Sequence, residues 1–157
     1  MSQLDHALQC ATLALDEHAA EPLVVACLLH DLGHLTHDLG EDAAERGHDD
    51  RHEYRALRLL RRLYDDEVTT PVRLHVEAKR YLCAVRTGYY ETLSPASRTS
   101  LALQGGPYTW AEAERYIAQP YADAAVALRL WDDRAKVPGA PTPRLDYFVD
   151  MLERCLR

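Results

Sequence analysis

The segment His30-Asp31-Leu32-Gly33-His34 places an imidazole directly beside a carboxylate, with a second imidazole one turn further on. It follows residues 23–29, a continuous run of apolar and small side chains that indicates a buried helix. A buried carboxylate or imidazole destabilises a fold considerably unless it is paired or binds a metal. A lone histidine in such a place is more often a hydrogen-bonded core residue, but the adjacent His-Asp pair, followed by Gly-His, favours a metal site.

Four further side chains able to bind a metal lie in other predicted helices: His6, His52, His75 and Asp132. Metal sites in helical bundles take their ligands from facing helices in this way. Imidazole and carboxylate ligands suit iron, manganese or zinc and disfavour metals that prefer thiolate. Together with His30 and Asp31 these ligands exceed what one catalytic metal needs while keeping a position open, so we predict two metals bridged by Asp31. Asp132 is preferred to Asp133 because it follows Arg129 by one helical turn and shares its face.

Three of these ligands have a polar or cationic neighbour one helical turn away. The pairs are His30 with His34, His75 with Lys79, and Asp132 with Arg129. Residues at these spacings share a helix face, so we expect His34, Lys79 and Arg129 to point into the same cavity as the metals. Arginine binds phosphate-like oxygens through a bidentate fork, lysine acts as a point charge, and Ser97 near a helix start can add a hydroxyl donor. The alternative is that Lys79 and Arg129 make ordinary surface or ion-pair contacts.

The elements that must position these side chains are helices, because apolar residues recur at helical spacing along nearly the whole chain. The helices expected are 2–19, 22–35, 51–65, 70–86, one from Ser94-Pro95 to Gly105-Gly106-Pro107, then 109–118, 121–135 and 143–156. Thr109 and Glu112 have the spacing of a capping box. Residues 36–50 are polar, acidic and contain glycine, which indicates an exposed loop. No segment alternates as a strand would, so we predict an all-α fold with residues 1–157 in a single domain, a helical bundle of about seven or eight helices.

The overall composition is that of a globular protein, with 47% hydrophobic and 27% charged residues. The net charge of -7 and the lack of a basic stripe argue against nucleic acid or an anionic membrane surface as a partner, although local cations can still hold a small anion. The four cysteines are scattered and lie mostly among apolar neighbours, which is typical of reduced thiols in the cytoplasm. We therefore expect a cytoplasmic protein, a monomer or a homodimer, with a small anionic substrate.

Several blocks of this sequence are similar to one family. The blocks are Gln3-Leu4-Asp5-His6-Ala7-Leu8-Gln9-Cys10, His75-Val76-Glu77-Ala78-Lys79-Arg80-Tyr81-Leu82, Leu93-Ser94-Pro95-Ala96-Ser97-Arg98, Gln104-Gly105-Gly106-Pro107, Arg129-Leu130-Trp131-Asp132 and Lys136-Val137-Pro138-Gly139. Together with His30-Asp31-Leu32-Gly33-His34, which resembles the signature of the HD superfamily, they resemble the HD-domain mixed-valence diiron oxygenases that cleave organophosphonates. Myo-inositol oxygenase is a more distant chemical relative.

The resemblance implies an enzyme that oxidises a small 1-hydroxyphosphonate with O2 as co-substrate and breaks its C–P bond, releasing phosphate and a carboxylic acid. It implies a mixed-valence Fe(II)/Fe(III) pair, with one iron held by His6, His30, Asp31 and Asp132 and the other by His52, His75 and the bridging Asp31. The residues implied for binding the phosphonate are His34, Lys79, Ser97 and Arg129. Direct catalytic roles fall to Asp31, His34 and Lys79. Family members carry a Tyr-x-x-Glu lid ahead of the first histidine ligand, and the residues before His6 contain neither Tyr nor Glu, so we expect that lid to be missing, truncated or replaced from elsewhere.

Two other functions are compatible with the same residues. A metal-dependent HD phosphohydrolase acting on a phosphomonoester or nucleotide would use the two metals to activate water and the same cations to hold phosphate. A non-catalytic ligand-binding HD protein is the third interpretation, and the intact set of metal ligands argues against it. Dependence on O2 distinguishes the oxygenase from the hydrolase.

Overall fold

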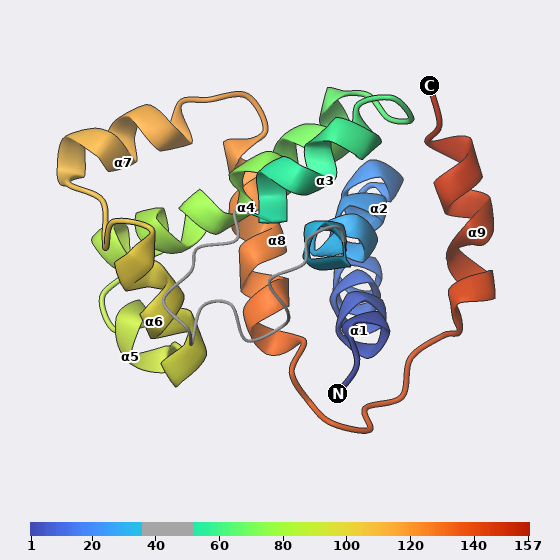
Figure 1. Ribbon diagram of the computed structural model, residues 1–157, viewed down its shortest axis with the longest axis horizontal. Helices are drawn as coiled ribbons and strands as arrows, with labels where there is room; N and C mark the ends of the chain where they lie inside the picture. The colour runs from blue at the N-terminus through green and yellow to red at the C-terminus, as the bar shows by residue number, and fades with distance from the viewer. Residues whose placement is uncertain (36–51) are drawn as a thin grey trace.

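A computed structural model describes residues 1–35 and 52–157 of the chain, and this part is built from helices (Figure 1). The helices are α1 (Gln3–Asp16), α2 (Glu21–Leu29), the short 3-10 helix η1 (Leu32–Leu35), α3 (His52–Leu60), α4 (Asp66–Val85), α5 (Tyr89–Thr92), α6 (Pro95–Leu103), α7 (Trp110–Ile117), α8 (Ala122–Arg134) and α9 (Leu145–Arg154). Among these described residues no strand is formed, and every α-helix except the four-residue α5 has at least eight residues. The prediction of an all-α bundle with about eight substantial helices is confirmed.

Local sequence signals explain where several helices begin. The Ser94 side chain accepts a hydrogen bond from the Ser97 amide, which caps α6 at the predicted Ser94-Pro95 start. Thr109 and Glu112 form the predicted capping box of α7. Each of these contacts satisfies amide groups that have no partner inside the first turn of a helix.

Several predicted boundaries are wrong, among them the end of the helix predicted over 51–65, which lies at Leu60. Helix α4 begins at Asp66, not at residue 70, because Asp65 takes the extended conformation of a cap and acidic side chains in the first turn complement the helix dipole. Pro71 therefore lies inside α4, where the long helix tolerates the loss of one amide donor. The predicted helix 22–35 ends at Leu29, with His30 as its cap, and the chain tightens into η1. Asp31 thus sits in the turn between the two helices.

Four helices form the centre of the fold. Helix α1 packs on α2, α2 on α4, α4 on α8, and α8 back on α1, so the contacts close a ring. The main core cluster draws fully buried residues from all four, including Cys10, Val25, Val72 and Leu128. In Figure 1, α5, α6 and α7 gather at one end of α4, while α9 lies at the opposite side of the molecule. The ring provides the rigid frame on which the polar site is built.

Two smaller clusters of buried residues attach the outer helices to this frame. Tyr116 of α7 clusters with Leu74 of α4 and Ala122 of α8, and its hydroxyl donates to the Leu74 carbonyl at 2.9 Å. Leu82 of α4 clusters with Leu101 of α6, which places α6 against the second half of α4. In the described ranges, no helix combines the length and the apolar character needed to cross a lipid bilayer.

Candidate metal centre

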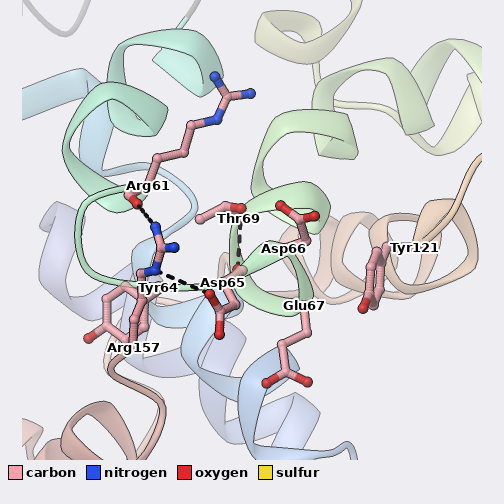
Figure 2. A pocket seen from close by; sticks show the side chains of 8 residues that line it. All are labelled: Arg61, Tyr64, Asp65, Asp66, Glu67, Thr69, Tyr121 and Arg157. Carbon is pink, nitrogen blue, oxygen red and sulfur yellow. Dashed lines mark hydrogen bonds and ion pairs between the residues drawn. The ribbon is translucent and has the colours of Figure 1, made fainter.

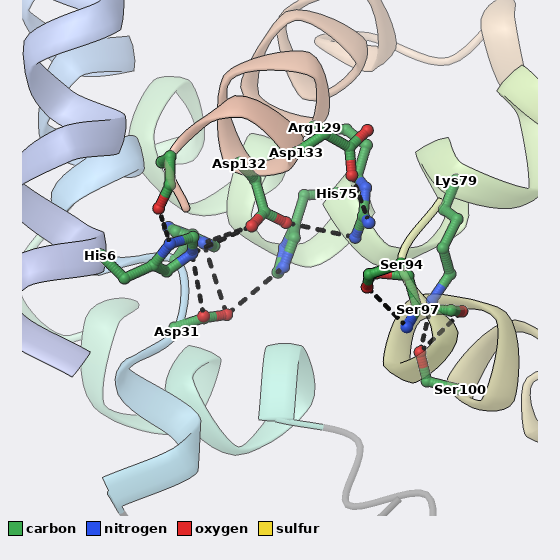
Figure 3. A network of polar contacts seen from close by, with 12 residues as sticks. His6, Asp31, His75, Lys79, Ser94, Ser97, Ser100, Arg129, Asp132 and Asp133 are labelled. Atoms are coloured by element: carbon green, nitrogen blue, oxygen red, sulfur yellow. Dashed lines mark hydrogen bonds and ion pairs between the residues drawn. The ribbon is translucent and has the colours of Figure 1, made fainter. Parts of the chain in front are cut away.

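The four helices of the ring each bring one candidate ligand to a common point. His6 comes from α1, His30 from the end of α2, His75 from the middle of α4 and Asp132 from α8. All four side chains are buried, and His30 and His75 are 0% and 1% exposed. Asp31 joins them from the turn after α2 (Figure 3). The structure thus brings together five of the six side chains predicted as metal ligands.

Each of the three imidazoles is oriented by a backbone carbonyl. The Nδ1 atom of His6 donates to the carbonyl of Ala135 at 2.7 Å, that of His30 to Cys27 at 2.7 Å, and that of His75 to Val72 at 2.6 Å. A carbonyl can only accept, so Nδ1 carries a proton, and the neutral form of each imidazole has its lone pair on Nε2. This is the arrangement that holds metal-binding histidines in one tautomer and one orientation.

The carboxylates complete the centre at distances suited to a bound ion. The Nε2 atom of His6 lies 3.0 Å from Oδ1 of Asp132 and 3.5 Å from Oδ2 of Asp31. The other oxygen of Asp31, Oδ1, lies 3.4 Å from Nε2 of His30 and 3.9 Å from Nε2 of His75. Ligand atoms about 2.1 Å from one ion stand roughly 3–3.5 Å apart. The two oxygens of Asp31 thus face different histidines, and the prediction that Asp31 bridges two metals stays a prediction.

Two groups of side chains in the described part of the chain could each hold a metal ion. One consists of His6, His30 and Asp132, and the other of His30, Asp31 and His75, with their ligand atoms within 4.8 Å of one another. The buried Nε2 atom of His30, common to both groups, makes no hydrogen bond with any residue that the structure describes. Since a buried polar atom is normally satisfied, this lone pair fits a metal ion. The side chain of His52 lies outside the described residues, so its predicted place as a ligand stays a prediction.

The electrostatics of the centre favour a cation. Burial disfavours the charged form of His30, but the carboxylates of Asp31 and Asp132 outweigh it and raise the pKa of His30 to about 10. Burial also disfavours the charged form of His6, but Asp132 outweighs this effect and raises the pKa of His6. Burial favours the neutral form of Asp132, yet Arg129 and the two imidazoles hold the pKa of Asp132 well below its usual range. The carboxylates of Asp31 and Asp132 create a negative potential that favours protonated imidazoles. The same potential attracts a metal ion, which binds only the neutral imidazoles.

His34 borders the centre, although not through the continuous helix that we predicted. It lies on η1, its side chain is 24% exposed, and its Nε2 atom is 3.8 Å from Oδ1 of Asp31. The His34 amide also donates to the Asp31 carbonyl at 3.0 Å, so the 3-10 turn determines where the side chain sits. The structure therefore places His34 beside Asp31, at the more exposed edge of the centre.

Lys79 and Ser97 lie on the facing sides of α4 and α6. Lys79 is 2% exposed, and its ammonium donates to the Ser100 hydroxyl at 2.8 Å (Figure 3). Burial, together with the nearby Arg129 cation, lowers the pKa of Lys79 to about 7. Ser97 is buried and its hydroxyl accepts from that of Ser94 at 3.1 Å. Lys79 is thus no surface lysine, but the hydroxyl that its ammonium contacts is that of Ser100, and the predicted role of Ser97 stays a prediction.

Sequence reasoning missed Ser100. The serines of α6 recur every three residues, at 94, 97 and 100, and this spacing places all three on one face of the helix. That pattern could have identified the whole row, but only tertiary packing shows that the row meets Lys79.

Arg129 lies between two carboxylates. Its Nη1 atom is 3.2 Å from Oδ2 of Asp132, and its Nη2 atom donates to Oδ1 of Asp133 at 2.6 Å. Its Nε atom donates to the Tyr89 hydroxyl at 3.4 Å, and Tyr89 in turn donates to Asp133. The preference for Asp132 as the ligand agrees with this arrangement, since Asp133 pairs with Arg129 and Tyr89. The ion-pair alternative for Arg129 is thus observed, and contacts within residues 1–35 and 52–157 engage three of its five N–H donors, leaving two for a ligand.

A separate pocket of about 490 Å³ lies around the beginning of α4 (Figure 2). It is lined by Arg61, Tyr64, Asp65, Asp66, Glu67, Thr69, Tyr121 and Arg157. Arg157 crosses it, 3.2 Å from the Asp65 carboxylate and donating to the Arg61 carbonyl at 2.8 Å. Its lining contains no histidine, and the pocket is distinct from the metal centre.

Comparisons with known proteins fit this site. Residues 4–106 match the family model described as HD domain. Hydroxymethylphosphonate dioxygenase of Gimesia maris is 42% identical over 160 residues, covering 99% of this chain and 78% of that protein. A glycine-betaine-forming dioxygenase of 1-hydroxy-2-(trimethylamino)ethylphosphonate from Leisingera caerulea is 36% identical over 154 residues, covering 98% of this chain and 79% of that protein. An uncharacterised protein of Acanthamoeba polyphaga mimivirus is 29% identical, with 96% and 70% covered.

Proposed function

Because the chain belongs to the HD-domain family and is related to phosphonate dioxygenases, we propose that it uses O2 to cleave the C–P bond of a small 1-hydroxyphosphonate. The products are phosphate and a carboxylic acid, and one O2 is consumed for each phosphate released. The observation that carries the proposal is the cluster of buried His and Asp ligands with the Lys79 ammonium and the Ser97 hydroxyl on the neighbouring helices.

We assign the metals as two irons in the mixed-valence Fe(II)/Fe(III) state. One iron is held by His6, His30, Asp31 and Asp132, and the other by His52, His75 and the bridging Asp31. His-carboxylate ligation is the donor set that non-haem iron takes in oxygenases. When bound, the irons supply the redox chemistry that O2 requires and the Lewis acidity that holds the substrate oxygens.

The side chains around the metals bind and orient the phosphonate dianion. Lys79 contributes a buried point charge, Ser97 a hydroxyl donor, and Arg129 its two remaining N–H donors. His34, at the more exposed edge, donates to a phosphonate oxygen from the opposite side. Holding the dianion at several points fixes C1 in one position relative to the metals and so lowers the entropic cost of reaction. Asp31, His34 and Lys79 are the residues to which we assign direct catalytic roles.

Anaerobic and aerobic assays test this function. Purified protein loaded with iron is incubated with hydroxymethylphosphonate, and O2 consumption and phosphate release are followed together. We expect equal amounts of both, with no phosphate formed when O2 is excluded. Phosphate release from a phosphomonoester that is indifferent to O2 would show instead a metal-dependent phosphohydrolase.

Electron paramagnetic resonance tests the iron assignment separately. Partly reduced, iron-loaded protein should give a mixed-valence signal that changes when a 1-hydroxyphosphonate is added. Activity that follows zinc or manganese content, with no such signal, contradicts the diiron assignment.

The remaining expectations from the sequence belong to the same proposal. We propose that residues 1–157 form one HD domain, since α8 lies beyond the matched range 4–106 yet packs on α4 and α1 and carries Asp132. We further propose that the protein is cytoplasmic and is a monomer or a homodimer. Its ligand is a small phosphonate, and it has no nucleic acid or membrane partner.

A further inference from the structure

We propose that Ser100 is a positioning residue for Lys79, whose hydroxyl holds the buried ammonium in the orientation that receives the anionic oxygens of a phosphonate. This inference rests on the proposed function, because it takes the phosphonate as the ligand of Lys79. It adds a residue that acts through Lys79 and separates the roles of neighbouring serines on one helix face.

The hydrogen bonds of Ser100 make it an acceptor toward Lys79. Its Oγ atom donates to the Ser97 carbonyl at 3.2 Å, a bond that serines inside helices commonly make with the preceding turn. The hydroxyl proton is therefore engaged with the backbone, and the lone pairs face the ammonium, which donates at 2.8 Å. Ser100 can hold the Lys79 cation in this state without offering a donor to an anion.

The hydroxyl of Ser97 has the opposite hydrogen-bonding role to that of Ser100. The Ser94 hydroxyl accepts from the Ser97 amide at 3.2 Å and donates to the Ser97 hydroxyl at 3.1 Å. The Ser97 oxygen thus accepts from Ser94, and its own proton remains available to donate elsewhere. Within one row of serines, Ser97 supplies a donor for an anion and Ser100 supplies the acceptor that orients the cation.

Lys79 needs such an acceptor because it is buried. An ammonium removed from water is strongly destabilised unless hydrogen bonds or charges compensate it. Across residues 1–35 and 52–157, Ser100 is its one hydrogen-bond acceptor, so two of its three N–H donors remain for an incoming anion. Without Ser100 the flexible lysine side chain would lose the contact that selects this rotamer.

A second contact keeps Ser100 within reach of Lys79. Arg80, the next residue on α4, donates to the carbonyl of Gly106 at 2.7 Å and to that of Gly105 at 3.3 Å. Its guanidinium also stacks on the Tyr108 ring, 4.4 Å from the ring centre. These contacts attach the end of α6 to α4, so the separation of Lys79 and Ser100 is fixed by the fold on both sides.

The test compares three variants of the iron-loaded protein. Ser100→Ala removes the acceptor, and Ser100→Thr keeps it. Thr99→Ala is the matched control, because this exposed hydroxyl lies on the same helix and donates to the Pro95 carbonyl at 3.0 Å. Binding of methylphosphonate, which lacks the hydroxyl that the proposed reaction requires, is measured by calorimetry without O2. KM and kcat are measured with hydroxymethylphosphonate, and iron content is determined for each variant.

We expect Ser100→Ala to raise the methylphosphonate Kd and the KM by about tenfold, as for the loss of one charge-assisted hydrogen bond, while kcat changes by less than about twofold. Ser100→Thr should restore both values, and Thr99→Ala should match the parent protein. Iron content should stay constant. Ser100→Cys, whose sulfur is a weak acceptor, should follow Ser100→Ala and provides a second variant if that one folds poorly.

Parent-like methylphosphonate binding by Ser100→Ala overturns the proposal, and so does a failure of the parent protein to bind methylphosphonate. Loss of iron or of kcat in parallel with binding, without recovery in Ser100→Thr, indicates a merely structural role and also overturns it. If the parent consumes no O2 with hydroxyphosphonates but the binding pattern holds, the oxygenase proposal fails while the role of Ser100 stands.

Discussion

The Nε2 atom of His6 lies 3.0 Å from Oδ1 of Asp132, so α1 and α8 close the metal centre from opposite ends of the chain. Both side chains are buried, and His6 is fixed from its other side by the Ala135 carbonyl, just after α8. The centre consequently depends on the packing of α8 against α1, and substitution of either His6 or Asp132 should reduce metal binding.

Asp31→Ala should remove both metals, because its Oδ2 atom faces His6 and its Oδ1 atom faces His75, which are the ligands assigned to different irons. We expect metal affinity to fall by more than ~100-fold, which exceeds the effect of losing a residue that only supports a ligand. Asp132→Ala should release one metal of the two. Metal content after gel filtration, measured by mass spectrometry, checks both.

The control for these variants is Asp123→Ala, since Asp123 is an exposed carboxylate in the first turn of α8. It should retain the full metal content. Retention of two metals by Asp31→Ala contradicts the bridging role.

Metal binding should release protons and weaken as the pH falls. The pKa of His30 is raised to about 10, so this imidazole binds a second proton in the metal-free protein at neutral pH, and the raised pKa of His6 makes it keep its second proton to a higher pH than usual. A metal ion needs their neutral forms and must displace these protons, which become harder to remove as the pH decreases. Calorimetric titration with zinc in buffers of different ionisation enthalpy measures the protons released. A binding enthalpy independent of the buffer contradicts the prediction.

The sequence predicted the frame of this site better than its surroundings. His6, His75 and Asp132 were recognisable because each lies in a strongly periodic helix, and helices of a bundle direct such residues toward a common centre. The end of α2 at Leu29 was not recognisable, since the apolar run continues to that point and local propensity does not distinguish an α-helix from a following 3-10 turn.

The hydrogen-bond partners of Arg129 and Lys79 could not be predicted from the sequence. The spacing of Arg129 and Asp132 predicted a shared face, but Tyr89, which helps to hold Arg129, comes from the unpredicted helix α5. Likewise, the hydrogen bond between Lys79 and Ser100 depends on how α6 packs on α4. Such pairings are determined by tertiary packing, which one sequence does not specify position by position.

The affinity for phosphonate should depend on the ionisation of Lys79. Burial and the Arg129 cation lower the pKa of Lys79 to about 7, so the ammonium loses its proton as the pH rises through that value. Lys79→Arg keeps a full charge throughout this range. The ratio of the Lys79→Arg Kd to the parent Kd for methylphosphonate should therefore fall as the pH rises from 6 to 8.5. The ionisation of the ligand is common to both proteins and cancels in this ratio. A constant ratio contradicts a titrating Lys79.

Lys79→Ala should separate binding of the anion from binding of the metals. Lys79 lies on α4 one turn beyond His75, and its ammonium bonds Ser100. We expect unchanged metal content and methylphosphonate binding weakened by ~10- to 100-fold, the size expected for a lost charge-assisted contact. Lys136→Ala, at the exposed second lysine of the chain, is the comparison and should change the Kd by less than about threefold. Equal effects of the two variants contradict a specific role for Lys79.

Gly105→Ala should destabilise the fold more than Gly106→Ala. Both glycines have a positive φ, +111° and +76°, but a Cβ atom at Gly105 would meet Nη2 of Arg80 at 2.9 Å, whereas a Cβ atom at Gly106 would meet open space. We expect losses in the free energy of unfolding of about 1 kcal/mol for Gly106→Ala and up to ~2 kcal/mol for Gly105→Ala, whose φ is less favourable for alanine and whose Cβ atom would displace the Arg80 guanidinium; urea denaturation measures both. In an Arg80→Ala background the excess cost of Gly105→Ala should shrink, because the contact is gone. Identical costs for the two glycines in the parent protein contradict the view that Arg80 fixes this turn. If Arg80 does fix it, Gly105→Ala should also raise the KM for the phosphonate, since the turn holds the end of α6 and thereby the position of Ser100.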